Sequence, residues 1–416
     1  MSSTGQKLWT RDFTIITVGT VVSMFGNTLS GFAMSLMVLD VSKSTPLYAI
    51  YLSMYTIPQL LMPLVSGAVL DRTSRKKTIY TLDFISAGLY ALMAVILSTG
   101  WFSFPFFAAY CFILGTIEST YMVAYDSFYP LLISEGNFQK AYSIASVLET
   151  MSAVLVPVSA VVYKTTGIAP LMVINAVCFF AAAVMETQIK ADEEYIEAQK
   201  STRLEGAGRL HQVIVDLKEG FGYLRGEKGL LAITVYFGVS TLCGCVTWVL
   251  TLPYFKANYD NGEFVYMLVW GMNVVGRMIG GGIHYKTVLP AKYRFSIAFL
   301  VYVVIAILEG TYLFMPIPVM MVFCFIVGIG GVTSYTIRIA ATQSYVPDEK
   351  KGRFNGAFNM LNTVGALGGE LFAGLMSIVM SERIVILIVM MFNALAAVVI
   401  MGGARHHVSK IYNRLQ

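Results

Sequence analysis

The sequence predicts an all-α membrane protein with twelve transmembrane helices. Of its 416 residues, 56% are hydrophobic and only 13% are charged, and the mean hydropathy is +0.69. Soluble domains carry roughly 25% charged residues, so this chain has too little polar surface to cover a water-soluble body. Long apolar runs and a strongly uneven distribution of basic loops lead to the same fold class.

Apolar runs long enough to cross about 30 Å of hydrocarbon recur along the chain. In the first half they predict helices at 13–39, 47–70, 78–99, 104–125, 141–163 and 169–187. In the second half they predict helices at 229–252, 264–285, 294–313, 317–337, 354–379 and 384–403. A short polar leader without a small-residue cleavage site precedes the first run, so we expect a retained helix and not a removed signal peptide.

A polar stretch divides the apolar runs into two groups of six. We therefore expect an N-terminal six-helix bundle at 1–187, a cytoplasmic linker at 188–228 and a C-terminal six-helix bundle at 229–416. Shifting the chain by about 213 residues aligns the two groups and places Gly67 on Gly280. This repeat predicts two pseudo-symmetric bundles in parallel orientation, with a binding site between the halves.

The basic residues fix the expected orientation. With the N-terminus inside, inner loops and tails hold 24 of the 29 lysines and arginines, and outer loops hold four. Cytoplasmic loops carry an excess of Lys and Arg in membrane proteins. We therefore expect a multi-pass protein of the cell (cytoplasmic) membrane with both termini cytoplasmic.

The loop after the second run reads Gly67-Ala-Val-Leu-Asp71-Arg72-Thr-Ser-Arg75-Lys76. It resembles the major facilitator signature G-x-x-x-D-R-x-G-R-[KR], with serine in place of the second glycine. The resemblance implies the major facilitator fold, and it implies that Arg75 pairs with an acid at the end of span four, for which Asp126 is placed. The cytoplasmic gate implied in this way comprises Gly67, Asp71, Arg72, Arg75, Lys76 and Asp126.

The segment Asp216–Leu224 is similar to the one before span seven in the macrolide-efflux and enterobactin-exporter branch of that superfamily. Its apolar residues share one helical face, so we expect an amphipathic helix on the membrane surface. Two positions depart from the efflux pattern. Cys111 stands where span four often has arginine, and Val156-Pro157-Val158-Ser159 replaces the glycine-proline motif linked to antiport.

Charged residues inside apolar spans are functional candidates, because each costs about 2.5–3.5 kcal/mol to insert. Glu149 and Arg277 both lie at a depth of ~12 Å, and we hypothesise that they pair across the halves; a static pair within one bundle is the alternative. Glu370 would bind a cation, a proton or a basic group, or else pack as a neutral acid. The residues expected to serve proton coupling or the substrate cavity are Glu118, Glu149, Arg277 and Glu370.

Other charges have a simpler expected role. Asp40, Lys164, Glu186 and Arg338 lie near helix ends, where long side chains can reach water. Asp83 lies deeper, in span three, and we expect a structural pairing for it, with a functional role as the alternative. Glu309 is expected to be peripheral.

Several function classes are disfavoured. The five cysteines and four histidines show no metal-ligand spacing, and there is no phosphate-binding Gly-Lys-Ser/Thr motif. We therefore expect no cofactor, no metal, no nucleic-acid partner and no enzyme activity. We also expect the protein to be a monomer.

The expected function is proton-coupled export of a hydrophobic or amphipathic small molecule by alternating access. Its partners would be that substrate, protons or another coupling ion, and the lipid bilayer. The chain is rich in Met, Phe and Tyr, whose flexible or aromatic side chains suit such ligands. An uptake transporter or lysolipid flippase of the same fold remains open, as does a non-transporting membrane receptor or scaffold.

Overall fold

The computed structural model describes residues 8–70, 73–134, 137, 140–141, 144, 148, 155–191, 215, 218–287 and 289–414, without the side chains of 64–70 and 348. These residues form helices, and no strand occurs among them. They belong to two compact units, Met1–Lys43 with Ile57–His211 and Ser44–Thr56 with Gln212–Gln416.

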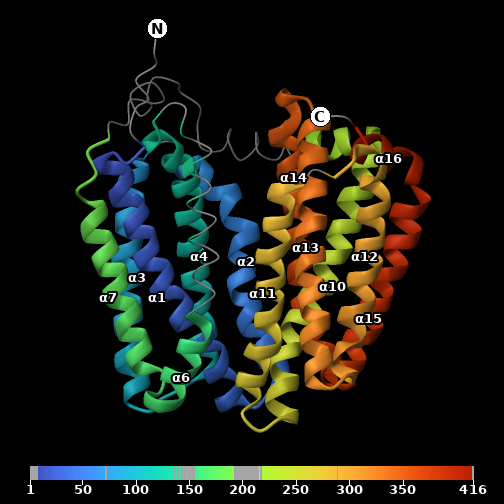
Figure 1. The fold of residues 1–416 in the computed structure, drawn as a ribbon. Helices are drawn as coiled ribbons and strands as arrows, with labels where there is room; N and C mark the ends of the chain where they lie inside the picture. The colour runs from blue at the N-terminus through green and yellow to red at the C-terminus, as the bar shows by residue number, and fades with distance from the viewer. Residues whose placement is uncertain are drawn as a thin grey trace. The chain divides into compact units, whose positions relative to one another are not determined.

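The first unit contains long helices that run side by side (Figure 1). Its helices are α1 (Arg11–Ser42), α3 (Arg75–Ser98), α4 (Phe104–Phe128), α6 (Val156–Thr166) and α7 (Ala169–Glu186). α7 packs against both α1 and α3, and α4 packs against α3. The helix α2 (Thr45–Leu70) begins in the second unit and ends in the first.

The second unit is also a helical bundle. Its helices are α10 (Lys228–Asn258), α11 (Gly262–Lys286), α12 (Arg294–Thr311), α13 (Ile317–Tyr345), α14 (Asp348–Met376), α15 (Glu382–Ala396) and α16 (Arg405–Tyr412). A π-helical segment, Ala397–Gly402, follows α15. α11 packs on α13, and α10 packs on α14.

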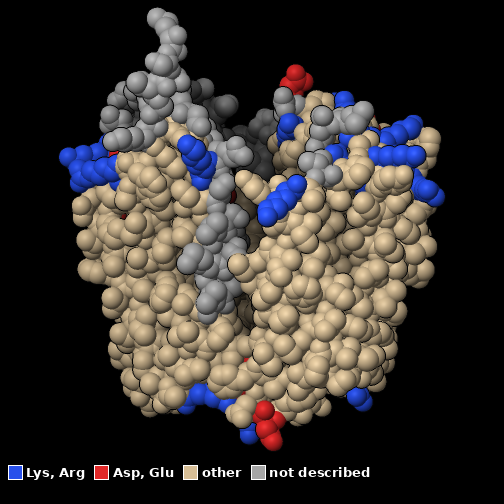
Figure 2. All heavy atoms as spheres, in the orientation of Figure 1, with Lys and Arg blue, Asp and Glu red and all other residues tan. Residues whose placement is uncertain are grey.

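Most of these helices suit a lipid environment. Among the described residues, nine helices have the length and apolar composition of a membrane span, and they coincide with nine of the predicted runs. The predicted spans at 47–70 and 354–379 are also long helices, α2 and α14, whereas the span at 141–163 lies partly outside the described residues. In the face that Figure 2 shows, Lys and Arg gather at the helix ends and uncharged residues cover the middle. The prediction of an all-α membrane fold is confirmed.

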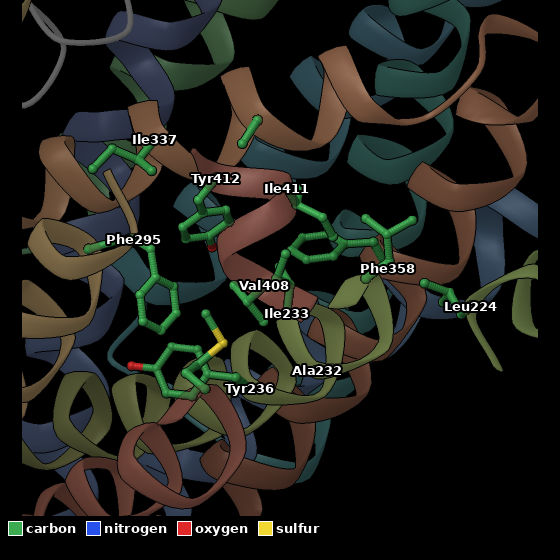
Figure 3. Close-up of a cluster of buried hydrophobic side chains, with 14 of the residues drawn as sticks. Leu224, Ala232, Ile233, Tyr236, Phe295, Ile337, Phe358, Val408, Ile411 and Tyr412 are labelled. Carbon is green, nitrogen blue, oxygen red and sulfur yellow. The ribbon is translucent and has the colours of Figure 1, made fainter. Parts of the chain in front are cut away.

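The last helix, α16, is an element not predicted from the sequence. Its Val408, Ile411 and Tyr412 are buried in the core of the second unit, beside Tyr236 and Phe295 (Figure 3). The hydroxyls of Tyr302 and Tyr412 are hydrogen-bonded at 2.9 Å. The chain after α15 therefore packs back against the second unit, and α16 contributes side chains to its hydrophobic core.

The described part of the linker also packs on protein. Residues 218–226 are helical; Leu224 is buried in the same core and Phe221 packs against it. Glu219 forms a 2.6 Å ion pair with Arg353 of α14. The expectation that this apolar face lies on the membrane is therefore wrong for these two side chains, because the second unit covers them; the preceding apolar positions, Val213 and Leu217, lie outside the described residues.

Candidate functional site

A cavity of about 420 Å³ opens within the first unit, between α1, α3, α4 and α7. Its wall combines hydroxyl, amide and carboxyl groups with aromatic rings and methionines. The lining side chains are Thr17, Thr20, Ser23, Met24, Asn27, Asp83, Ser86, Tyr90, Leu114, Ile117, Glu118, Tyr121, Met122, Tyr125, Tyr129, Leu148 and Phe179. This volume falls within the range of ~300–1,000 Å³ that small-molecule pockets occupy.

One end of the polar wall is held by a hydrogen-bonded cluster. The Tyr90 hydroxyl donates to Asn27 Oδ1 at 3.3 Å, and Asn175 Nδ2 donates to the same oxygen at 3.2 Å. Asn175 Nδ2 also donates to Ser30 Oγ at 2.7 Å. Because donors from α3 and α7 both reach its carbonyl oxygen, Asn27 is fixed in orientation at the cavity surface.

Glu118, a residue singled out from the sequence, lies on this wall. The rings of Tyr121 and Tyr125 stack along the same helix with centroids 5.9 Å apart, and Tyr129 continues the stack at 5.1 Å. Asp83 is the other acid of the wall, and no Lys, Arg or His occurs among the described residues that line it. The cavity therefore offers negative and aromatic groups to a ligand.

The neighbour of Asp83 is an acid whose position the sequence did not reveal. The side chain of Asp83 is 1% exposed and that of Glu186 is 0% exposed, and the two carboxyls are close enough to interact. The expectation that Glu186 reaches water is wrong, because α1 and α3 both pack against α7. The depth of Asp83 in its span predicts a structural pairing. Its partner Glu186 could not be identified from the sequence, because an acid at a helix end is expected to reach water.

Glu370 of α14 lies in the second unit and is 8% exposed. Its Oε1 accepts a 2.8 Å hydrogen bond from Thr56 Oγ1, which belongs to the part of α2 that joins this unit. A hydroxyl donor thus stabilises a buried acid at the point where α2 meets α14.

Arg277 of α11 has an acid neighbour in its own unit. Its positive charge interacts with Glu309 of α12. Glu309 lines a small cavity with Asn273 and Tyr312, so this acid faces the bundle and not the periphery. Glu149 lies outside the described residues, and its pairing with Arg277 stays a prediction.

The expectation that the Arg338 side chain extends to water is wrong, because its guanidinium packs on aromatic rings. Its guanidinium lies over the rings of Phe358 at 4.6 Å and Phe237 at 4.8 Å, and over Tyr335 at 5.5 Å. Cation–π attraction replaces part of the lost hydration. Asp40 and Lys164, by contrast, are exposed at helix ends.

The motif between α2 and α3 is described in part. Ser74 caps α3, because its Oγ accepts from Lys77 N at 3.0 Å. Arg75 Nη1 donates to the Ser127 carbonyl at 3.0 Å, one residue beyond Asp126 in α4. Lys76 lies in the first turn of α3 and Asp126 is exposed. Asp71, Arg72 and the surroundings of Gly67 lie outside the described residues, so the full gate stays a prediction.

The helical arrangement and the residue pattern match a known family. Residues 16–370 fit the family model of the Major Facilitator Superfamily. The chain belongs to this superfamily. A relative, the uncharacterized MFS-type transporter YkuC of Bacillus subtilis (strain 168), is 24% identical over 288 residues. That match covers 67% of this chain and 66% of the relative, just under two thirds of its length.

Solved structures of the superfamily share the fold. A mutant of the nucleoside transporter NupG superposes with a TM-score of 0.70 at 11% identity, over 95% of this chain and 99% of its own. The POT family transporter PepTSo gives a TM-score of 0.66 at 15% identity, over 96% of this chain and 98% of its own. At such identities the likeness shows the major facilitator fold and nothing about the substrate. The chain is thus a multi-pass membrane protein of this superfamily.

Proposed function

We propose that this major facilitator protein exports a hydrophobic or amphipathic small molecule in exchange for protons, as in the exporter branch that its linker segment resembles. The observation that carries the proposal is the cavity of the first unit, which combines acids with aromatic and thioether side chains. Phe179, Tyr90 and Met24 offer apolar contact to a ligand body. Glu118 offers a negative charge to a cationic group or a proton.

Proton coupling is proposed for the acids within the helices. An acid inside the membrane is costly when charged, so a change of its protonation shifts the relative stability of two conformations of a transporter. Glu118 faces the first-unit cavity and Glu370 is held by Thr56. Glu149 and Arg277 belong to the same proposal on the basis of their predicted depth.

A gating role is proposed for the signature-like motif that begins α3, with Arg75 joining α3 to α4. Its contact with the carbonyl of Ser127 supports the proposal. Gly67, Asp71, Arg72, Lys76 and Asp126 complete the proposed gate on the cytoplasmic side.

The test uses the full chain in reconstituted vesicles with ethidium, a flat aromatic cation, as the probe. We expect an imposed pH gradient to drive ethidium flux in the unchanged protein and to fail in Glu118→Gln and in Glu370→Gln. Asp40→Asn is the matched control, because Asp40 is an exposed acid at a helix end. Full pH-driven flux in both glutamine variants would refute the assignment of coupling to these acids.

A further inference from the structure

Two buried acids from different helices face each other in the first unit. Asp83 lies in α3, about 12 Å from the start of that helix, and Glu186 is the last residue of α7. The two helices pack along each other, and the two carboxyls interact at almost complete burial. Neither acid belongs to the predicted coupling set.

Three of the four carboxyl oxygens of the pair receive no hydrogen bond from other groups in the described part of the chain. Apart from their mutual contact, Asp83 Oδ2 and both oxygens of Glu186 have no hydrogen-bond partner among the described residues. Buried carboxyl oxygens in proteins are normally paired with donors or cations. A proton held by the pair itself would supply such a donor.

A shared proton supplies that donor. Two carboxylates are both acceptors and repel each other, whereas one carboxylic acid and one carboxylate form a strong hydrogen bond. Two acids that share a site hold one proton between them for this reason. One proton binds without any other bond being made or broken, and its release leaves two facing negative charges.

Within the described part of the chain, the surroundings of the pair add no base and no cation. The titratable neighbours are Tyr121 and Tyr125 of α4, whose hydroxyls interact with Glu186, and Glu118 lies on the same cavity wall. On the α1 side, Gly19 faces Glu186. A methyl group at Gly19 would come within 3.1 Å of Glu186 Oε1, so glycine leaves the room that this carboxyl occupies.

The pair reaches water through the cavity. Asp83 lines the 420 Å³ cavity, and Glu186 is the buried neighbour of Asp83. A proton from the cavity would reach Asp83 first and then be shared with Glu186. The same cavity would hold the substrate. Binding of the substrate there would therefore change the affinity of the pair for its proton.

We infer that Asp83 and Glu186 form a proton-binding site that exchanges through the first-unit cavity. The part of this inference that concerns transport rests on the proposed function, in which the site would bind the coupling proton. It differs from the coupling assignment above, because it places a proton on α3 and α7 and not on Glu118 or Glu370.

The first measurement does not depend on transport. We expect the thermal unfolding midpoint of the purified full chain to fall by several degrees from neutral to alkaline pH, as the shared proton is lost. Asp83→Asn and Glu186→Gln should each remove most of that fall, because an amide donor then faces a single acid. Asp40→Asn should keep it, and the same alkaline fall in all four proteins would overturn the inference.

The second measurement separates the inference from the proposed function. In vesicles, Glu186→Gln should lose pH-driven ethidium flux but keep ethidium exchange without a pH gradient, because Glu186 does not line the cavity. Unchanged pH-driven flux in Asp83→Asn and Glu186→Gln would overturn the transport role of the pair. Absence of pH-driven flux in the unchanged protein would instead refute the proposed function, and the alkaline stability profile would still decide whether the pair binds a proton.

Discussion

At the scale of single residues, Arg75 of α3 donates a hydrogen bond to a backbone carbonyl of α4. The last four carbonyls of a helix have no partner within it, and Ser127 supplies one of these at the end of α4. Arg75 satisfies it from the first turn of α3 with a charged donor, the favourable sign for a helix C-terminus.

Replacing Arg75 by alanine should therefore destabilise the junction of α3 and α4. We expect Arg75→Ala to lower the free energy of unfolding by about 1.5–3 kcal/mol, the range for losing a hydrogen bond to a charged group. Thermal unfolding in detergent measures this loss. Lys77→Ala is the control, since its side chain is exposed on the same turn; equal losses in both variants would show that the Ser127 contact contributes nothing.

The sequence allows the prediction of some residues of the site and not of others. Glu118 is recognisable because a single acid interrupts an apolar run, and the structure places it on a cavity wall. Glu186 is not recognisable, since its burial depends on α1 and α3, which are far from it in the chain. Glu309 is misjudged for the same reason, because its charged neighbour Arg277 comes from another helix.

At the scale of helices, the close packing of α1 on α7 depends on Gly26. A methyl group there would overlap Asn175 Oδ1 and lie 2.9 Å from Cys178 Cβ. Asn175 also holds Asn27 at the cavity surface. The approach of these two helices and the shape of the cavity are therefore linked.

We expect Gly26→Ala to push α1 away from α7 and to cost about 1–3 kcal/mol of stability, as overpacked cores do. Gly31→Ala is a matched control in the same helix, because open space surrounds that position. The control should be neutral or gain up to about 1 kcal/mol from better helix propensity. The thermal unfolding midpoints of the two variants measure this difference. A Gly26→Ala variant as stable as Gly31→Ala would contradict the close packing of α1 on α7.

Helix ends and the tail were harder to predict than the spans. The apolar period of a span is visible in sequence, and nine of the predicted runs coincide with membrane-type helices among the described residues. α16 carries only a few apolar residues between charged ones, so its buried face becomes evident only where Tyr412 meets Tyr302. Arg338 is similar, because its aromatic neighbours Phe237 and Phe358 come from α10 and α14.

At the scale of the whole molecule, membership of the major facilitator superfamily follows from a pattern that spans residues 16–370. The family assignment leaves the substrate and the driving ion open, since the cavity chemistry is local and the relatives are distant in sequence. The proposed proton coupling is based on Glu118 and Asp83, which line the cavity, and on Glu186, the buried neighbour of Asp83.

Coupling is reciprocal, so a substrate gradient must move protons if a proton gradient moves substrate. The most direct measurement loads vesicles with a pH-sensitive dye and imposes an ethidium gradient without any initial pH difference. We predict proton movement opposite in direction to ethidium in the unchanged protein, and none in Glu118→Gln. Ethidium flux through the unchanged protein with no accompanying proton movement would contradict proton-coupled export.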